Sequence, residues 1–526
     1  MLSGCATPRG GEAAHGRASP LNPRQRGPLD LRQPSPLNLR VDCANSAVVG
    51  LRWDPAPRPS LLKFWQRRHP AVYQLSRDGV AIATTTETTY SDSSVAGATS
   101  YRYSLERIDA SGETTTEAVS AAIPPQGPTA DPPYCNSHVL SLEDVDWADG
   151  YHESNGSDLW HVTWGADGDA YAFFGDGGGI GGDNSRGRTS FGIAALPAPP
   201  PRTATTAYNL YGGFEARHPA LIDGKAGSLI AVGSDFYVLG GIYTRSDLDA
   251  VCGDCTGAPK THRSGSPSRL QLAVSRRNAY SWRAEDWSFC RGDLPLSDPA
   301  AGALCPSSFV NYGRGNSGAP GGYVYILGGF NSASYWTNQP NTGPARTYLV
   351  RVSPTRMLER EAYEYFAGLD TRGKPTWSHD LKRLQPIFTD ANPTRSGCGG
   401  VCDMTSVLSQ VVYDAPLKRY IGVAQGGSLA QSSFYEAPEL WGPWSVISYN
   451  NIDPSSGAGG WGNLGLAAGE SLGVNIVNAW TSPDGLALWL AYSSNGKAPP
   501  GALFPPAGSA LDSLNLVRMR LRHAPD

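Results

Sequence analysis

Short alternating runs of apolar and polar residues recur along this chain and predict β-hairpins rather than helices. The clearest hairpin lies in residues 157–183, where two runs rich in aromatic and β-branched residues flank a polar turn at Asp167 and Gly168. Asp158 precedes Asp167 by nine residues, and Asp176 follows it by nine. A hairpin centred on this turn therefore predicts that the two carboxylates face each other, about 5 Å apart at their Cβ atoms.

Two acids at the open end of one hairpin have two interpretations. Carboxylates held this close repel each other, so a functional pair would do acid–base work on a bound substrate. Aspartate is also common at loop ends, where it caps turns without any chemistry. The hairpin alone does not decide between these interpretations.

The same pattern, an apolar strand, a polar turn and an apolar strand led by an aromatic residue, occurs five times. The leading aromatic residues are Tyr171, Tyr237, Tyr325, Tyr420 and Trp489. Their separations of 66, 88, 95 and 69 residues are typical of four-stranded blades with loop insertions. Residues 138–526 are therefore predicted to form a five-bladed β-propeller, with a β-sandwich or β-helix as the alternative. One helix is expected, at residues 357–366, between two blades.

Alignment of the hairpins on their turns predicts a polar residue level with Asp158 in every blade. In chain order these residues are Lys225, Asn311, Ser406 or Gln410, and Asn475 or Asn478. Strands buried on both faces are normally apolar there, so this recurrence favours a binding site at the propeller mouth. A solvated strand end would explain Lys225 equally well. Trp160 and Trp480 are candidates for stacking on a sugar ring, although most propeller tryptophans pack between blades.

Residues 37–124 have the pattern of a separate β-sandwich, with Trp53 on a short alternating strand and Tyr101 beginning another. This segment resembles a fibronectin type III domain, in which Trp53 would be the core tryptophan and Tyr101 the corner tyrosine. The resemblance implies a spacer or weak binding module. The proline-rich stretch 125–137 is predicted to be a semi-rigid linker.

Composition agrees with an all-β protein, because 62 glycines and 42 prolines punctuate the 526 residues while methionine occurs only four times. The formal net charge is −4, without a basic run in the folded region, which argues against a nucleic-acid partner. No apolar stretch of 18 residues occurs, so the sequence predicts no membrane-spanning helix. We expect a monomer without a cofactor, and no P-loop, Gly-x-Ser-x-Gly or His-Glu-x-x-His motif is present.

The first of nine cysteines, Cys5, follows Leu-Ser-Gly in a segment that resembles the lipobox of bacterial lipoproteins. The resemblance implies lipidation of Cys5, a membrane anchor, and residues 1–36 as a lipobox and flexible tether. Ala6 after the cysteine suggests the outer membrane or cell surface. A chance four-residue match is the alternative, since the apolar part of a signal peptide would have to precede the motif.

The other eight cysteines are enough for four disulfides, as expected of an exported protein. Cys43 and Cys135 flank the fibronectin-like segment and are candidates to pair across its exit. Cys252 and Cys255 could be half of a zinc site, but no matching histidine pattern lies nearby. Structural disulfides are therefore the preferred interpretation.

Several short motifs together resemble a β-propeller family that includes bacterial endo-D-arabinanases and was long labelled a domain of unknown function. The motifs are Gly156-Ser-Asp158-Leu-Trp160, Gly175-Asp176-Gly177, Lys225-Ala-Gly-Ser-Leu-Ile, Asn311-Tyr-Gly313, Glu436-Ala-Pro-Glu-Leu-Trp-Gly-Pro-Trp444 and Ala479-Trp-Thr-Ser-Pro-Asp-Gly485. The resemblance implies a glycoside hydrolase whose catalytic acids are Asp158 and Asp176, acting within a furanose-rich glycan such as D-arabinan.

Two functions from different classes follow. The first is an exported endo-glycosidase whose Asp158 and Asp176 cleave a polysaccharide, while a second set of side chains binds it. That set is Trp160, Lys225, Asn311, Asn475 and Trp480. The second is a lipid-anchored surface protein that binds or adheres to glycan without cutting it.

Overall fold

The computed structural model describes most of the chain from residue 37 onward. The described residues are 37–55, 71–108, 114–125, 131–146, 151–154, 156–183, 185–243, 269–291, 304–329, 345–370, 372–390, 408–425, 432–449, 471–494 and 513–524. Within them the regular elements are strands, apart from the short helix α1 (Thr203–Thr206) and single 3-10 turns. The predicted all-β class is confirmed. No helix of this part of the chain is long and apolar enough to cross a membrane.

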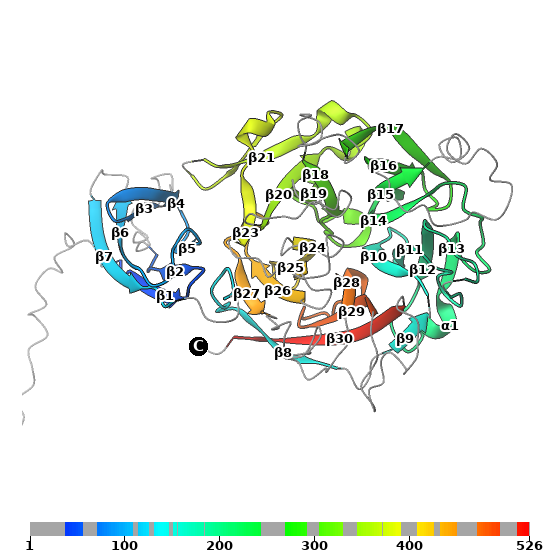
Figure 1. Ribbon diagram of the computed structural model, residues 1–526, viewed down its shortest axis with the longest axis horizontal. Coiled ribbons are helices and arrows are strands. Elements are labelled where there is room, and N and C mark those ends of the chain that lie inside the picture. The colour runs from blue at the N-terminus through cyan, green and yellow to red at the C-terminus, as the bar shows by residue number, and fades with distance from the viewer. Residues whose placement is uncertain are drawn as a thin grey trace, which may run out of the picture.

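The N-terminal part consists of two antiparallel sheets, drawn in blue in Figure 1. One contains β1 (Arg40–Ala44), β2 (Val49–Arg52) and β5 (Thr89–Asp92); the other contains β4 (Val80–Thr85), β3 (Val72–Arg77), β6 (Ser100–Ile108) and β7 (Thr114–Ala122). Trp53 is 1% exposed and packs edge-on against Tyr73. The Tyr101 hydroxyl accepts a hydrogen bond from the Ala96 amide at 3.0 Å, the contact expected of a corner tyrosine.

The remaining strands form five antiparallel sheets. Sheet one contains β10 (Asp158–Trp164), β11 (Ala170–Gly175), β12 (Gly192–Leu196) and β13 (Tyr208–Tyr211). Sheet two contains β14 (Asp223–Val232), β15 (Asp235–Tyr243), β16 (Arg269–Ser275) and β17 (Trp282–Arg291). Sheet three contains β18 (Cys305–Phe309), β19 (Val324–Gly329), β20 (Ala345–Val352), β21 (Glu364–Leu369) and β22 (Pro375–Ser378), with β23 (Pro386–Asp390) also on β20. Sheet four contains β24 (Leu408–Asp414), β25 (Arg419–Gln425), β26 (Ser432–Ala437) and β27 (Ser445–Ser448). Sheet five contains β28 (Ser471–Ile476), β29 (Ala487–Ser494), β30 (Leu514–His523) and β8 (Leu140–Val145), with β9 (Tyr151–Ser154) also on β30.

The first strands of the five sheets contact one another in chain order, and β28 of sheet five contacts β10 of sheet one. Figure 1 shows the sheets arranged about a common centre. A hydrophobic cluster lies between each pair of neighbouring sheets, including sheets five and one. Strand β11 shows the consequence, because Tyr171 and Phe173 pack toward sheet two while Ala172 and Phe174 pack toward sheet five. Burial on both faces explains its uninterrupted apolar sequence.

Sheet five combines strands from both ends of this part of the chain. β8 pairs with β30, and ion pairs join the two strands beyond their backbone hydrogen bonds. Arg518 contacts Asp146 at 2.9 Å, and Arg520 contacts Asp144 at 2.7 Å and Asp146 at 3.2 Å. These two acids are therefore engaged in holding the outer strand of the sheet.

The helix predicted for residues 357–366 is wrong. The segment contains the 3-10 turn Arg360–Ala362 and the start of strand β21. Tyr363 and Tyr365 are buried in the cluster between sheets two and three. Glu364, which separates them, pairs with Arg351 at 2.8 Å across the strands. This alternation of buried aromatic and outward polar residues suits a strand, and packing outweighed the helical propensity of the segment.

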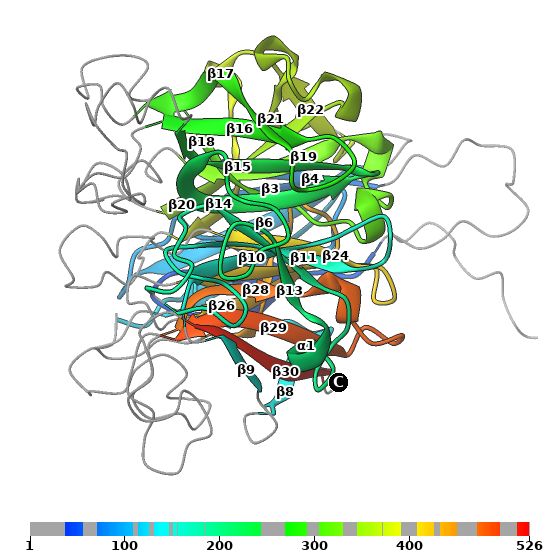
Figure 2. The same cartoon turned by 90° about the vertical axis from the view of Figure 1, so that its right-hand side faces the viewer.

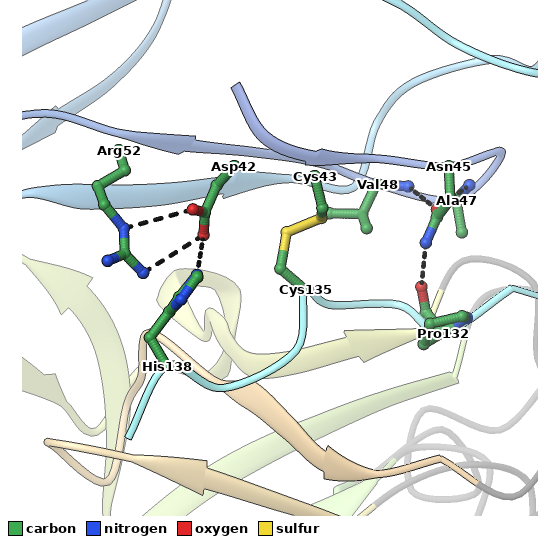
Figure 3. Close-up of a disulfide and its surroundings, with 9 residues drawn as sticks. All are labelled: Asp42, Cys43, Asn45, Ala47, Val48, Arg52, Pro132, Cys135 and His138. Carbon is green, nitrogen blue, oxygen red and sulfur yellow. Dashed lines mark hydrogen bonds and ion pairs between the residues drawn. A yellow bond between two sulfur atoms is a disulfide. The ribbon is translucent and has the colours of Figure 1, made fainter. Parts of the chain in front are cut away.

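A disulfide between Cys43 and Cys135 joins the fibronectin-like part to the rest of the chain, which confirms the predicted pair (Figure 3). His138 Nε2 lies 2.6 Å from Asp42 Oδ2, and Arg52 also contacts this carboxylate, at 3.4 Å. Of the other cysteines, Cys252, Cys255, Cys398 and Cys402 lie outside the described residues, and only the backbone of Cys290 and Cys305 is described.

The end of the predicted linker is packed against sheets three and four. Asn136 pairs with Val446 of β27 as a parallel bridge, and the Val446 amide donates to the Cys135 carbonyl at 2.8 Å. The Tyr134 hydroxyl accepts a hydrogen bond from Thr389 at 2.8 Å. Residues 131–137 therefore fix the fibronectin-like part beside these sheets, as Figure 1 shows.

A buried carboxyl lies where sheets four and five meet. Asp414 is 3% exposed, and its Oδ1 accepts a hydrogen bond from Leu417 at 3.1 Å. Its Oδ2 has no hydrogen-bond partner among the described residues. Burial, with a smaller contribution from Asp484, raises the pKa of Asp414 from 3.8 to about 6. The ionised form is thus destabilised in the folded protein.

Asp414→Asn is expected to stabilise the protein above pH 6. In the unfolded chain Asp414 ionises near pH 4, but in the folded chain only near pH 6, so folding stability is lost as pH rises through this window. The variant should recover roughly 2–3 kcal/mol at pH 7.5 and nothing below pH 4. Urea denaturation at both pH values measures the difference. Asp370→Asn, in an exposed turn, should give no such gain, and an equal gain at both pH values would contradict the assignment.

Candidate active site

The hairpin of β10 and β11 has the predicted register over most of its length. His161 lies opposite Phe173, and Trp164 lies opposite Ala170, as in a hairpin centred on Asp167. Between Asp158 and His161 a bulge shifts the pairing, so that Asp158 lies opposite Gly175. The expectation that Asp158 and Asp176 are directly opposed is therefore wrong by one residue. A bulge inserts one extra residue into one strand and re-aims the side chains beside it.

The backbone around both acids is left-handed at three residues that are not glycine. Ser157 has a φ of 80° and Leu159 a φ of 66°, on either side of Asp158, and Asp176 itself has a φ of 56°. In a regular strand, a shift of the pairing by one residue would turn a side chain to the other face of the sheet. Asp176 does not follow this rule, because its left-handed backbone departs from the extended conformation of a strand. Such conformations cost about 1–3 kcal/mol each and cluster at functional sites.

Arg188 lies beside Asp176 and was not predicted to belong to the site. Gly177 and Thr189 form a two-residue β-bridge, which brings Arg188 back to the end of β11. An Arg188 guanidinium nitrogen lies 3.9 Å from Asp176 Oδ1, and both side chains are about one-sixth exposed. The guanidinium also donates a hydrogen bond to the Asp176 carbonyl. A positive charge therefore lies beside the Asp176 carboxylate.

Asp158 and Lys225 occupy equivalent positions in sheets one and two. Each is followed by a bulge in the first strand, before His161 in β10 and before Ser228 in β14. Lys225 lies opposite Gly241 as Asp158 lies opposite Gly175. The structure describes the backbone of both residues and not their side chains. Their predicted roles therefore remain predictions.

The other first strands do not carry a polar residue at this level. The same bulge occurs after Pro306 in β18, after Leu408 in β24 and after Leu472 in β28. Asn311 lies beyond the far end of β18, where its Oδ1 accepts a hydrogen bond from Gly313 at 3.0 Å. Asn475 lies just past the bulge of β28. Asn311 and Asn475 were expected to lie level with Asp158 in their sheets, and the structure shows that they do not.

Polar residues on the first strands connect neighbouring sheets instead. Thr163 Oγ1 accepts a hydrogen bond from the Ala231 amide at 2.9 Å, and Ser228 Oγ accepts one from Phe309 at 3.0 Å. Gln410 Oε1 accepts one from Ile476 at 2.6 Å. These side chains satisfy backbone groups that the buried strands would otherwise leave unpaired. The recurring polarity of the sequence therefore has a structural cause.

His161 and Asn475 make the corresponding contact between sheets one and five, through a side-chain hydrogen bond. Asn475 is 1% exposed. Burial lowers the pKa of His161 to about 4, against the opposing effect of the Asn475 hydrogen bond. The imidazole is therefore neutral at physiological pH. The observed role of Asn475 is this hydrogen bond between two sheets. Its predicted role in substrate binding remains a prediction.

The two predicted tryptophans lie in different surroundings. Trp160 is fully buried, packs against Phe174 with ring centroids 5.0 Å apart, and donates from Nε1 to the Ser157 carbonyl at 3.1 Å. It supports the backbone before Asp158 and presents no free face to a sugar. Trp480 lies in the 3-10 turn Asn478–Trp480, beyond the far end of β28, and packs edge-on against Trp489.

The longer connections between strands lie at the end of the sheets that carries Asp158 and Asp176. Figure 2 shows the strands from the side, running roughly side by side. At this end the number of residues in the sequence between the described ends of successive strands is 15 to 25 for β15 and β16, β19 and β20, β23 and β24, β27 and β28, and β29 and β30. At the other end the connections range from residues 233–234 between β14 and β15 to residues 310–323 between β18 and β19. Long connections on a rigid scaffold commonly carry binding residues.

Within the described part of the chain, no group of three or more His, Cys, Asp or Glu side chains is arranged to hold a metal ion. Asp183, which follows the glycine-rich turn of residues 177–182, is hydrogen-bonded by residues close to it in the sequence. Its Oδ1 accepts hydrogen bonds from the Ser185 amide at 2.8 Å and the Arg186 amide at 2.6 Å. These backbone hydrogen bonds hold the pKa of Asp183 down at about 2. Hydrolysis by a pair of carboxylates needs no metal.

Arg188→Met is expected to shift the pH dependence of catalysis. The substitution keeps the length of the side chain but removes the charge beside Asp176. We expect the acid limb of the pH–rate profile to move to higher pH and kcat/KM at neutral pH to fall by about 10-fold or more. The matched control is Arg356→Met, because Arg356 is 54% exposed and pairs with Glu359 rather than with Asp176. An unchanged acid limb in Arg188→Met would contradict the pairing.

No model of a known protein family matches the chain, and no curated protein matches it. Solved structures do resemble it. Alignment with a β-xylosidase covers 70% of this chain and 95% of that protein, at 11% identity and a TM-score of 0.35. Alignment with the GH43_1 enzyme from Xanthomonas citri complexed with xylose covers 71% and 89%, at 11% identity and a TM-score of 0.34. A human fibronectin type III domain, from fibronectin type III domain containing protein 3, aligns over its full length with 20% of this chain, at 17% identity and a TM-score of 0.15. The structural neighbours therefore include GH43 glycoside hydrolases and fibronectin type III domains.

Proposed function

We propose that this chain is a glycoside hydrolase that uses Asp158 and Asp176 as its catalytic pair. One observation carries the proposal: left-handed, non-glycine backbone occurs at Ser157 and Leu159 around the first acid and at the second acid itself. A turn or a cap does not require three such residues at one strand end. Backbone held in costly conformations around two carboxylates is consistent with a site built to place them.

Arg188 suggests how the two roles are divided. Beside its guanidinium, Asp176 is suited to act as a carboxylate, either as the nucleophile or as the base that activates water. Asp158 would then protonate the leaving-group oxygen as the glycosidic bond breaks. The carboxyl separation would set the stereochemistry: about 5–5.5 Å gives retention, and about 6.5–9.5 Å leaves room for water and gives inversion.

The scaffold we propose is a closed five-bladed propeller in which each sheet is one blade. The contact between β28 and β10 and the cluster shared by sheets five and one support this closure. The strand pairing of β8 with β30 would join the beginning and end of the ring. Asp158 and Lys225, at equivalent places in successive blades, would then face the same entrance.

For the substrate we propose a furanose-rich bacterial glycan such as D-arabinan, cleaved within the chain. The sequence motifs around Asp158, Asp176 and Lys225 support this choice through their resemblance to the endo-D-arabinanase family. Lipidation of Cys5 and export to the cell surface are also proposals, because Cys5 lies outside the described residues.

The test is a screen of the purified protein against a panel of bacterial wall glycans that includes D-arabinan, with analysis of product size. Release of oligosaccharides of several lengths from D-arabinan would support endo-cleavage. Cleavage of another glycan instead would support the proposed hydrolase activity and contradict the proposed substrate. Glycan binding without any cleavage, by a protein shown to be folded, would favour a binding or adhesion protein instead.

A further inference from the structure

Two turns at the end of sheet one meet at the side chain of Asn209. Asn209 lies in β13 and is 3% exposed. Its Nδ2 donates to the carbonyls of Gly178 at 3.1 Å, Ile180 at 2.9 Å and Phe214 at 2.7 Å. Its Oδ1 accepts from the Ile180 amide at 2.9 Å. One buried amide therefore holds the glycine-rich turn that follows Asp176 and also the turn that follows β13.

The glycine-rich turn is packed tightly against this amide. A Cβ atom at Gly179 would collide with Asn209 Oδ1, and one at Gly213 would lie 3.0 Å from the Asn209 amide group. Gly179 has a φ of 68°, which a residue with a side chain adopts only at a cost. The glycines thus let the backbone approach Asn209, and the turn has little freedom to shift while the amide is in place.

The same turn is linked to the segments that carry both acids. The Gly179 amide donates to Ser157 Oγ at 2.8 Å, and Ser157 directly precedes Asp158. On the other side, Gly177 pairs with Thr189, next to Arg188. The turn therefore contacts Ser157, which precedes Asp158, and its residue Gly177, which follows Asp176, pairs with the neighbour of Arg188.

We infer that Asn209 is a positioning residue, which keeps Asp176 in its left-handed conformation beside Arg188. The inference rests on the proposed function and deepens it, because it assigns a second layer to the same site. Without the amide, the carbonyls of Ile180 and Phe214 lose this donor and the Ile180 amide its acceptor, while the Gly178 carbonyl keeps the Phe214 amide. Buried groups left unpaired drive local rearrangement. Asp176 has a φ of 56° and depends on its surroundings to stay there.

Two variants separate positioning from general stability. Asn209→Ala removes all four hydrogen bonds, whereas Asn209→Asp keeps the acceptor for Ile180 and the side-chain volume but removes the donors. The matched control is Asn278→Ala, because the Asn278 amide oxygen organises an unrelated turn by accepting from Tyr280 and Ser281. If Asn209→Ala does not fold, Asn209→Asp, which keeps the side-chain volume and places an acceptor where the donors were, still tests the contacts with the carbonyls.

Hydrogen exchange followed by mass spectrometry measures how well the backbone amides of the turn are protected, and it does not require an active enzyme. We expect amides in residues 176–189 and 212–216 to exchange at least about 10-fold faster in both Asn209 variants, with no change in sheet four. In kinetic assays kcat should fall by about 10-fold or more while KM changes by less than about 3-fold. Asn278→Ala should leave both measurements as in the wild type.

Each result decides a different point. Unchanged exchange in residues 176–189 would overturn the inference, and so would faster exchange with an unchanged kcat in an active enzyme. A fall in kcat that Asn278→Ala matches would reduce Asn209 to a stability residue. If the wild type cleaves no glycan, the proposed function fails, and the exchange experiment alone then decides whether Asn209 holds the turn around Asp176.

Discussion

Asp158→Asn and Asp176→Asn should each lower kcat/KM for glycan hydrolysis by about 10³-fold or more. The amide has nearly the shape of the carboxylate but cannot transfer the proton or attack the sugar. Glycan affinity should therefore change by only a few fold. Initial rates by reducing-end analysis, with binding by calorimetry on the same samples, measure both quantities.

Asp167→Asn is the matched control for these two variants. It makes the same isosteric change in the same hairpin, but at the turn, where the Asp167 carboxylate accepts hydrogen bonds from Asp169 and Tyr171. Its activity should stay within about two-fold of the wild type. An Asp158 or Asp176 variant that kept more than about a tenth of wild-type activity would remove that residue from the chemistry.

Loss of the Cys43–Cys135 disulfide should have the largest effect on stability. The bridge spans 92 residues of sequence, and the loop entropy of the unfolded chain predicts a contribution of about 4.6 kcal/mol. The double variant Cys43→Ser/Cys135→Ser should therefore unfold at a lower temperature by several degrees. Differential scanning calorimetry measures the first transition, and the rate of glycan cleavage at low temperature should hardly change.

Reduced wild-type protein provides the control for the serine substitutions. If the disulfide alone is responsible, reduction should lower the first midpoint to that of the double variant. Equal midpoints for oxidised wild type and the double variant would show that packing of residues 131–137 holds the two parts together without the bridge.

Local sequence patterns were sufficient to predict the strands and much of the first hairpin. The register of β10 and β11 is as predicted from His161 to the turn, because the turn type fixes the pairing beside it. The pair Cys43 and Cys135 could also be predicted, since the two cysteines flank one module. Residues 357–366 were harder, because burial between two sheets, and not propensity, determines their conformation.

The candidate site depends on contacts that sequence alone does not show. The bulge after Asp158 recurs after Lys225, Pro306, Leu408 and Leu472, in the first strand of every sheet, so it belongs to the arrangement of the sheets and not to a local motif. Gln410 was interpreted as part of the binding site, but its side chain accepts a hydrogen bond from the next sheet. Ser228, which the sequence did not single out, does the same. Arg188 reaches Asp176 through a two-residue bridge that has no signature of its own.

The central claim is that a glycan is cleaved at the end of the sheets that carries Asp158 and Asp176. A crystal structure of the Asp176→Asn variant with an uncleaved oligosaccharide of the best substrate tests it most directly. The claim predicts a glycosidic oxygen within hydrogen-bond distance, about 3 Å, of the Asp158 carboxyl, with the substituted amide side chain on the opposite side of the sugar. An oligosaccharide bound at the far end, near Asn311 and Trp480, would contradict it.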